Sequence, residues 1–247
     1  MSDGWIVTEP GPTDTIQIWS VDLALSADRL ARCDAWLSPA EAARAGRYLR
    51  AEDRDRSRAS HAALRLILAH ALGVAAEALA FAPGPAGKPE LAGAQAGALH
   101  FNLSHSGTRA LVGVSPKAAI GVDVEALRAV PDALRIARAH FARAEAEALA
   151  ALPPEAVGAA FTGLWTRKEA VVKALGAGLS LPLDRLALTL PPAPPRLVAI
   201  VGDDPAAWSL HHLEPGPGTV GTAAIRAAGA TIARCALPQD WPDRHPR

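Results

Sequence analysis

The stretch WTRKEAVVKALG, residues 165–176, decides the fold of the second half of this chain. It predicts the end of a helix that runs over about residues 156–175 and that Gly176 and Gly178 terminate. Glu169 and Lys173 lie one turn apart on the same face of this helix. An exposed Glu–Lys pair is the ordinary interpretation of that spacing, and part of a site for a charged ligand is the alternative.

Upstream of this helix, the stretch GVDVE, residues 121–125, alternates as a β-strand does. Its valines face the core together with Ile120, while Asp123 and Glu125 share the other face, ~7 Å apart along the strand. A solvated strand face is one interpretation, and convergence of both carboxylates on one ion is the other.

With Glu169 as a third carboxylate, the donor set contains neither His nor Cys, which suits Mg²⁺ rather than Zn²⁺. Mg²⁺ takes its other ligands from water and substrate phosphates, and Lys173 would neutralise a phosphate as a compact charge. Positioning and charge neutralisation of this kind are what phosphoryl transfer requires.

The elements predicted elsewhere give a mixed α+β fold. The segment SPAE, residues 38–41, has a capping serine, a proline at the first helical position and a glutamate at the third, which is typical of a helix start. Helices are predicted over residues 38–48, 52–72, 131–151 and 156–175. Strands are predicted over 16–25 as an edge strand, over 101–107, in a hairpin of 110–114 and 119–125 around Ser115-Pro116, and over 183–190, 197–213 and 219–235. Residues 82–90 are expected to form a loop, 191–195 a hinge-like break, and 238–247 a loosely ordered tail.

Two short internal echoes indicate two related halves. Residues 48–52 (YLRAE) resemble 141–145 (FARAE), and residues 70–73 (HALG) resemble 173–176 (KALG). The chain would then divide into an N-terminal α+β half and a C-terminal α+β half, each a small antiparallel sheet packed with helices, over residues 1–117 and 118–247.

The two halves differ at the charged positions of the predicted helix. Counting back from the shared glycine aligns Glu169 with Leu66 and Lys173 with His70. Only the second half keeps the charged pair, so we expect one active site rather than two.

Composition argues against several classes of protein. Lys+Arg and Asp+Glu balance at 25 each, which disfavours a role driven by overall charge at nucleic acid or membranes. Cys33 and Cys235 lie far apart, so neither a disulfide framework nor a thiolate zinc site is expected. No signal-peptide pattern opens the chain and no apolar run approaches the ~20 residues of a membrane helix, so we expect a cytoplasmic protein.

Three further places carry groups that could contact phosphates. Ser104-His105 follows a predicted strand, and Lys88 lies between Gly87 and Pro89 in the predicted loop. Either place could instead hold ordinary turn or solvated loop residues. The third place is a cluster of arginines in the first helical region: Arg44, Arg47, Arg50, Arg54, Arg56 and Arg58. Most of them must be solvated, but some could form an anion pocket.

Taken together, these elements resemble the 4′-phosphopantetheinyl transferases of the surfactin-synthetase-activating type. Residues 121–125 resemble that family's G-[IV]-D-[IV]-E motif, and residues 165–173 resemble its W-[ST]-x-K-E-x-x-x-K motif. The order and spacing of the motifs agree over residues 38–190. Three further elements of the family are matched by residues 87–89 (GKP), 102–106 (NLSHS) and 141–145 (FARAE). The resemblance implies a pseudo-dimer of two α+β halves with the site between them.

The resemblance also implies roles for the candidate residues. Asp123, Glu125 and Glu169 would bind Mg²⁺ together with the pyrophosphate of coenzyme A, and Lys173 would hold a phosphate and support the leaving group. Lys168 would orient the helix or touch the edge of the ligand. Residues implied to grip the phosphates and adenosine of coenzyme A, besides Asp123 and Lys173, are Arg44, Arg56, Lys88, Ser104 and His105.

In the implied reaction, a serine hydroxyl of an apo acyl or peptidyl carrier protein attacks the phosphate that bears the pantetheine arm and releases adenosine 3′,5′-bisphosphate. Glu169 and a metal-bound water are both candidates for the base. Carriers of peptide, polyketide, fatty-acid and siderophore pathways all fit as partners. Two related halves in one chain favour a monomer.

One position departs from the family's pattern, because Glu41 stands where some relatives carry a lysine after Ser-Pro. Part of the phosphate pocket would then be weaker, or built from Arg44 and Arg47. A protein that binds coenzyme A without chemistry and a metal-dependent phosphodiester hydrolase are the alternative functions. The intact acidic positions disfavour the first, and the lack of a second metal cluster disfavours the second.

Overall fold

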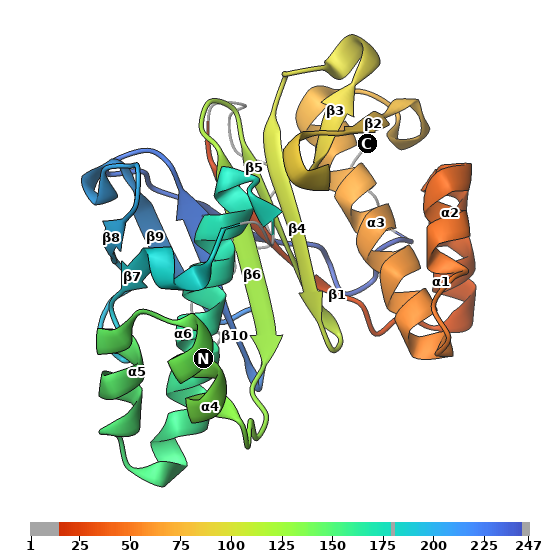
Figure 1. Cartoon of the computed structure of the whole chain (residues 1–247). Coiled ribbons are helices and arrows are strands. Elements are labelled where there is room, and N and C mark those ends of the chain that lie inside the picture. Colours follow the sequence, from red (N-terminus) through yellow and green to blue (C-terminus); the bar gives the residue numbers. More distant parts are fainter. Residues whose placement is uncertain (1–14, 179–180, 244–247) are drawn as a thin grey trace. The chain divides into compact units, whose positions relative to one another are not determined.

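The computed structural model describes residues 15–178 and 181–243 of the chain, which form two compact units (Figure 1). Within the described residues, unit 1 consists of 15–82, 89–117 and 232–243, and unit 2 consists of 83–88, 118–178 and 181–231. This division differs from the expected one, 1–117 and 118–247, at two segments. A short loop before residue 89 belongs to unit 2, and the end of the chain belongs to unit 1.

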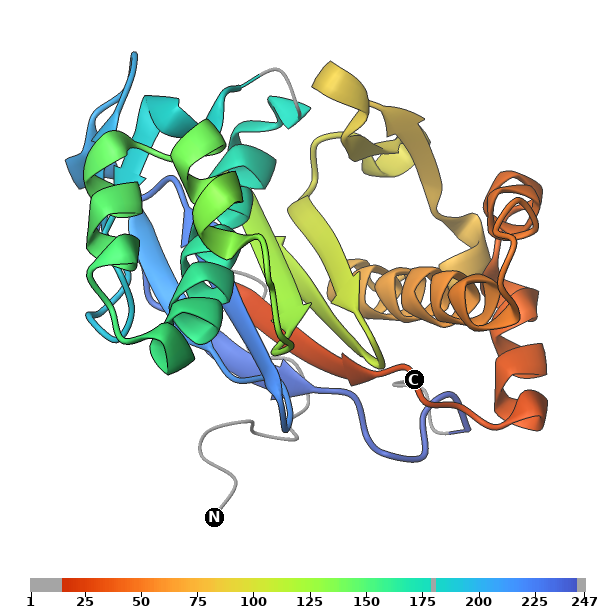
Figure 2. The ribbon, with the colours of Figure 1, turned by 60° about the horizontal axis from the view of Figure 1, so that its bottom comes forward.

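Unit 1 is a sheet packed with helices. Its strands lie in the order β11 (Ala233–Ala236), β1 (Gln17–Asp22), β5 (Arg109–Ser115) and β4 (His100–Ser106), with β11 parallel to β1 and the other neighbours antiparallel. Three helices follow β1 along the chain, α1 (Ala27–Cys33), α2 (Pro39–Ala45) and α3 (Ala51–Leu72), and then a two-stranded sheet of β2 (Ala80–Pro83) and β3 (Pro89–Ala92). Apolar side chains of α3 and of the sheet share one core. Figure 2 shows α3 as the long orange helix.

Unit 2 has the same construction. Its sheet has the antiparallel order β6 (Ile120–Ala126), β10 (Thr219–Ile225) and β9 (Ser209–Leu213). Helices α4 (Ala133–His140), α5 (Arg143–Ala150) and α6 (Pro154–Leu175) follow β6, and β7 (Leu186–Leu188) and β8 (Leu197–Ile200) form a second, two-stranded sheet. The apolar core of this unit is built mainly from α6, α4 and α5 with the small sheet.

The two units repeat one order of elements: a strand, three helices, a two-stranded sheet and two more strands. Strands β1, β5 and β4 correspond in chain order and in sheet position to β6, β10 and β9. Helices α3 and α6 each have 22 residues, and their limits lie 103 positions apart, 51 to 154 and 72 to 175. The expected relation between the halves is therefore present in their topology, with β11 as an addition to unit 1.

Local sequence explains where these helices begin and end. The predicted helix start at residue 38 is confirmed, since the Ser38 hydroxyl accepts from the amide of Glu41 and the Glu41 carboxylate accepts from the amide of Ser38. The 22-residue helices α3 and α6 both end at a glycine in the left-handed region, Gly73 and Gly176, each with a φ of 65°. Both ends were expected from the sequence.

Several predicted strands are paired differently from the expectation. Residues 17–22 do not form an edge strand, because β1 lies between β11 and β5. The predicted hairpin around Ser115-Pro116 is wrong: β5 pairs with β4 and β1, whereas β6 pairs with β10 in the sheet of unit 2. The partner that forms a hairpin with β5 is β4, and the turn between them contains Gly107 with a positive φ.

Other elements differ from their predicted lengths. The predicted helix over 131–151 is two helices, because Phe141 is extended, with φ −99° and ψ 164°. The helix predicted to reach residue 48 ends at Ala45. The strands predicted over 183–190, 197–213 and 219–235 are shorter, and the last two are each divided, into β8 and β9 and into β10 and β11. The loop expected over 82–90 includes the end of β2 and the start of β3.

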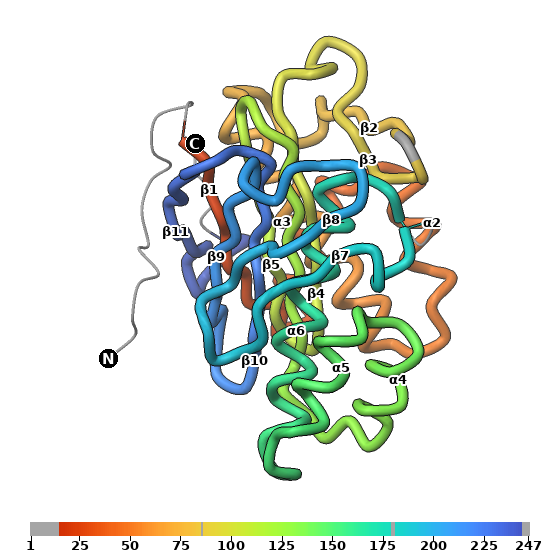
Figure 3. The backbone as a smooth tube through the Cα atoms, turned by 60° about the vertical axis from the view of Figure 1, so that its left-hand side comes forward, coloured from red at the N-terminus to blue at the C-terminus, as the bar shows by residue number. Residues whose placement is uncertain are grey.

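The described end of the chain is well packed, against the expectation for 238–247. Trp241 is buried in the core of unit 1, and its indole N–H donates to the carbonyl of Asp22 at 2.9 Å. Asp243 forms ion pairs with Arg29 and Arg32 of α1. Residues 244–247 lie outside the described part. Figure 3 shows β11 alongside β1.

Among residues 15–178 and 181–243, no helix has both the length and the apolar character that a membrane span needs.

Candidate active site

The site in unit 2 is built where the backbone of α6 lies directly on β6, two neighbours that Figure 1 labels. Gly121 makes this approach possible. A Cβ atom added to Gly121 would lie 2.1 Å from the carbonyl oxygen of Ala170 and 2.4 Å from the amide nitrogen of Ala174. A buried hydrogen bond from α6 to the sheet lies close by, since the hydroxyls of Thr166 and Thr222 are 3.1 Å apart. The first residue of the GVDVE motif is thus a packing requirement.

The same approach brings Asp123 to Lys173. The ammonium of Lys173 donates to Oδ1 of Asp123 at 2.6 Å, which joins the strand to the helix across 50 positions of sequence. The side chain of Asp123 is 5% exposed and that of Lys173 is 29% exposed, so one end of the ion pair is buried and the other is open to solvent. Of the two interpretations of this strand, the solvated face does not apply to Asp123, which is buried almost as fully as the valines beside it.

Glu169 belongs to the same group of charges. Burial raises the pKa of Glu169, the charge of Lys173 lowers it, and the charge of Glu125 raises it again. The ion pair of Lys173 with Asp123, and the charge interactions of Glu169 with Lys173 and Glu125, link these four side chains in unit 2.

The donor chemistry of this group suits Mg²⁺, since all three acidic side chains offer oxygen and two of them repel one another. As these side chains stand, however, no three Asp, Glu, His or Cys residues in the described ranges are close enough to hold an ion. The Lys173 ammonium lies on Asp123 instead. The residues fit a hard divalent cation chemically, and the magnesium site remains a prediction.

Lys88 contacts the same two elements. Its ammonium donates to the carbonyl of Ile120 at 3.0 Å and to the carbonyl of Lys173 at 2.7 Å. A cation is favourable at the carbonyl of Lys173, in the last turn of α6, because the C-terminal end of a helix carries partial negative charge. Lys88 thus joins β6 to α6 within unit 2, and its predicted contact with phosphate remains a prediction.

Four candidate residues lie in unit 1. Arg44 is exposed in the last turn of α2, and Arg56 on α3 forms an ion pair with Asp53 at 3.1 Å. Ser104 and His105 lie next to each other on β4, Ser104 buried and His105 exposed. Their roles at a phosphate or at adenosine remain predictions.

Glu41, the departure from the family's pattern, has a structural role. Its carboxylate caps α2 and accepts from Nε of Arg65 at 2.8 Å, and both side chains are nearly buried. Glu145 caps the start of α5 as Glu41 caps the start of α2, so these two glutamates correspond. The first internal echo, which aligned Glu145 with Glu52, is therefore out of register. The second echo, at the ends of α3 and α6, is confirmed.

Trp165 and Lys168 of the WTRKE stretch both pack inside unit 2, Trp165 against its apolar core and Lys168 fully buried. The ring of Trp165 packs against Phe141 and Phe161, with centroids 6.2 and 5.9 Å away. Lys168 is fully buried and forms an ion pair with Glu145 at 2.6 Å. Burial lowers the pKa of Lys168, and the charge of Glu145 raises it. The sequence gives one signal for this pair, the F-x-x-x-E element that precedes the helix.

Sequence comparisons relate both units to one family. The profile of the 4′-phosphopantetheinyl transferase superfamily matches residues 119–228, and a profile described as 4′-phosphopantetheinyl transferase, N-terminal, matches residues 26–117. The 4′-phosphopantetheinyl transferase HetI of Nostoc sp. is 35% identical over 230 residues, which are 91% of this chain and 94% of that protein.

Other relatives match over shorter regions. The 4′-phosphopantetheinyl transferase Sfp of Bacillus subtilis is 30% identical over 173 residues, 69% of this chain and 74% of its own. The slr0495 protein of Synechocystis sp. is 40% identical over 146 residues, 59% of either chain. A crystal structure of the holo-[acyl-carrier-protein] synthase of Thermotoga maritima covers 44% of this chain and 63% of its own, at 18% identity and a TM-score of 0.36, too partial a likeness to carry an argument.

Proposed function

This chain belongs to the 4′-phosphopantetheinyl transferases, and from that premise we propose that it moves the 4′-phosphopantetheine group of coenzyme A to a serine of an apo acyl or peptidyl carrier protein. In the transfer, the serine oxygen forms a bond to the phosphorus that bears pantetheine. The bond from that phosphorus to the bridging oxygen breaks, and adenosine 3′,5′-bisphosphate leaves with the electron pair. The serine proton goes to Glu169.

The charges of unit 2 divide between binding and leaving-group stabilisation. Lys173, which is partly open to solvent, neutralises charge that develops on the leaving phosphate. Asp123, Glu125 and Glu169 are the residues that would hold Mg²⁺, which would neutralise the diphosphate of coenzyme A. When Lys173 turns to the leaving phosphate, it gives up its contact with Asp123, so one side chain has two alternative anionic partners.

One observation supports the proposal above the others. Two motifs that are well separated in the sequence meet at the Gly121 contact, and an acid from one lies 2.6 Å from the lysine of the other. Phosphoryl transfer needs such preorganised charge and little covalent chemistry from the protein.

The proposal is tested by mixing the protein with Mg²⁺, coenzyme A and apo carrier domains of the peptide, polyketide and fatty-acid types. Intact-mass spectrometry then shows whether a carrier gains phosphopantetheine. We expect Asp123→Asn and Glu169→Gln each to lower the rate by about 100-fold or more while the circular dichroism spectrum is kept.

Matched controls lie in the same unit. Asp132→Asn changes an aspartate at the start of α4 that pairs with Arg135 in solvent, and Glu155→Gln changes an exposed glutamate in the first turn of α6. Both should keep the wild-type rate. Transfer to none of the carriers, or wild-type rates in both site variants, would overturn the proposed function.

A further inference from the structure

Lys168 makes a closed set of contacts inside unit 2. Its ammonium forms the ion pair with Glu145 and donates to the carbonyls of Leu183 at 2.9 Å and Leu186 at 2.7 Å. These carbonyls flank a single 3₁₀ turn over Leu183–Arg185, one from its first residue and the other from the residue that follows it. The other oxygen of Glu145 accepts from the amide of Leu188 on β7 at 2.8 Å. The pair therefore joins α5, α6 and β7.

Unit 1 contains the same arrangement. Nε of Arg65 on α3 pairs with Glu41 of α2 at 2.8 Å, and Nη1 donates to the carbonyls of Ala76 at 2.9 Å and Leu79 at 3.0 Å. These carbonyls also come from the first residue of a 3₁₀ turn, Ala76–Ala78, and from the residue that follows it. Arg65 and Lys168 occupy equivalent positions of the two 22-residue helices, 103 positions apart (65 to 168).

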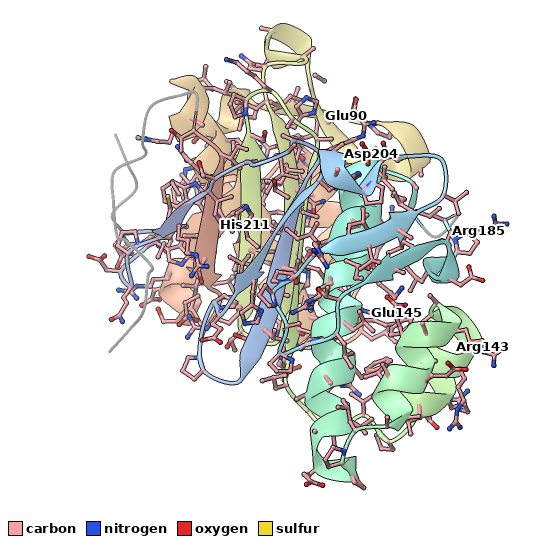
Figure 4. All side chains as sticks on the ribbon, turned by 90° about the vertical axis from the view of Figure 1, so that its left-hand side faces the viewer. Glu90, Arg143, Glu145, Arg185, Asp204 and His211 are labelled. Atoms are coloured by element: carbon pink, nitrogen blue, oxygen red, sulfur yellow. The ribbon has the colours of Figure 1, made fainter. Side chains whose placement is uncertain are left out.

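An aromatic ring lies beside each cation, but it comes from a different element in each unit. Phe81 on β2 lies 5.0 Å from the Arg65 guanidinium carbon, and Phe141 before α5 lies 4.9 Å from the Lys168 nitrogen. The shared parts are the helix cation, the capping glutamate and the 3₁₀ turn. Figure 4 labels Glu145 where α5 meets α6, with Arg143 pointing away.

The repeat distinguishes contacts that stabilise the fold of a unit from residues that belong to the acidic site. In unit 1 the residue that follows the cation is Leu66, in the place of Glu169, and His70 stands in the place of Lys173. The contact set of Arg65 is kept although the acidic site is absent there. A contact set present in both units belongs to the fold of each unit, and substrate is not needed to explain it.

On this ground we infer that Lys168 is a positioning residue, which sets the rotation of α6 and thereby the placement of Glu169 and Lys173, and that it does not contact substrate. The inference rests on the proposed function for its kinetic consequence. At 100° per residue, Lys168 points to the side of α6 opposite Ala170 and Ala174, which lie against Gly121. The helix is thus fixed on one side by β6 and on the other by the Lys168–Glu145 pair.

The test compares Lys168→Met with Arg65→Met, the same deletion in the unit without the acidic site. Because small misplacement of reacting groups costs up to ~100-fold in rate, we expect Lys168→Met to lower kcat by about 10-fold or more. Its KM for coenzyme A should stay within about 3-fold of wild type, since no contact with the ligand is removed. Arg65→Met should leave kcat within about 3-fold at a temperature where both variants are folded.

Lys168→Arg is the rescue variant, because the equivalent position in unit 1 is an arginine with the same set of acceptors, one carboxylate and two carbonyls. We expect it to recover kcat to within about 3-fold of wild type. If Lys168→Met does not fold, Glu145→Gln takes its place, since glutamine keeps the size of the side chain and an acceptor for the amide of Leu188.

Amide hydrogen exchange gives a readout that needs no activity. Lys168→Met should speed exchange at residues 183–188 and not at 76–81, and Arg65→Met should do the reverse. Three outcomes would overturn the inference. Lys168→Met could change neither kcat nor exchange, or it could raise only the KM for coenzyme A. Arg65→Met could lower kcat as much as Lys168→Met does. If wild type modified no carrier, the proposed function would fail, and exchange would still decide whether the pair positions α6.

Discussion

At the scale of single residues, unit 2 depends on one position without a side chain. Gly121 lies under α6 with less space than a methyl group needs, and the atoms it would meet belong to the helix backbone, which cannot turn aside as a side chain can. The distance between β6 and α6 that brings Lys173 to Asp123 is set by this contact. A methyl group here should therefore affect both stability and the site.

We expect Gly121→Ala to lower the free energy of unfolding by about 3 kcal/mol, measured by urea denaturation, because a Cβ there forces α6 away from the sheet. Transfer activity should fall with it. Gly158→Ala on the same helix is the matched control, since a Cβ at Gly158 meets nothing within 4 Å. That control should raise the free energy of unfolding by about 0.5–1 kcal/mol, as alanine favours a helix more than glycine does. Equal effects of both substitutions would contradict this account of Gly121.

A second prediction concerns Cys33, which is fully buried in the core of unit 1. Burial, helped by the charge of Asp34, raises the pKa of the Cys33 thiol to about 12. At pH 8, Cys33 of the folded protein should therefore not react with a thiol reagent. Denaturant should expose the thiol and allow the reaction. Because the pKa in the fold lies above that of an unfolded thiol, the stabilisation is complete below about pH 8.5 and is lost as the pH rises toward 12. Cys33→Ala should show a weaker loss of stability over that range, and rapid labelling of native Cys33 would contradict the burial.

At the scale of elements, the two long helices offer a matched pair of ends. Gly73 and Gly176 both take a φ of 65°, a backbone conformation in which alanine is strained. Both positions have space for a Cβ atom: one at Gly73 would meet nothing within 4 Å, and one at Gly176 would lie 3.6 Å from Cδ of Lys88. Gly73→Ala and Gly176→Ala should each lower the free energy of unfolding by about 1 kcal/mol, measured by denaturation of each variant. A large effect at only one of the two would show that the ends are not equivalent.

Elements that depend on local chemistry could be predicted from the sequence, and elements that depend on distant pairing could not. The capping residues of α2 and the terminal glycines of α3 and α6 are fixed by neighbouring hydrogen bonds and by backbone conformation. The pairing of β6 is decided by β10, about 100 positions later, and nothing in the Ser115-Pro116 turn excludes a hairpin with β5. Adjacency in sequence was therefore misleading at β5 and β6, although β4 and β5, and β9 and β10, are neighbours both in sequence and in their sheets.

The candidate site shows the same contrast. Strand alternation and helix spacing placed Asp123 with Glu125 on one strand face and Glu169 with Lys173 on one helix face, and the ion pair of Asp123 with Lys173 shows that the two elements meet. Convergence of the three carboxylates on one ion stays a prediction. The buried partners of Lys168 could not be derived from spacing, because Glu145 lies on another helix and a Lys–Glu pair is ordinarily exposed. The topological repeat is what identifies its role, and it becomes visible only when both units are compared.

At the scale of the whole molecule, the two units are not two successive segments of the chain. Residues 232–243 return from unit 2 to unit 1, where β11 pairs with β1 and Trp241 fills the core. We expect Trp241→Ala to lower the free energy of unfolding by about 4 kcal/mol, measured by denaturation, because a large ring leaves a cavity. Trp241→Phe should cost about 1–2 kcal/mol, since it keeps most of the volume and loses the hydrogen bond to Asp22. Equal losses in both variants would point to the hydrogen bond instead of the packing.

The return of β11 also has a consequence during synthesis. Among the elements of residues 15–178 and 181–243, the ribosome makes β1 first and β11 last, so β1 waits for its parallel neighbour until all the others have been made. Until then, one edge of a nascent sheet stays open to pairing with another polypeptide. A premature stop codon anywhere before residue 233 would leave that edge open permanently, so even late truncations should yield aggregation-prone products.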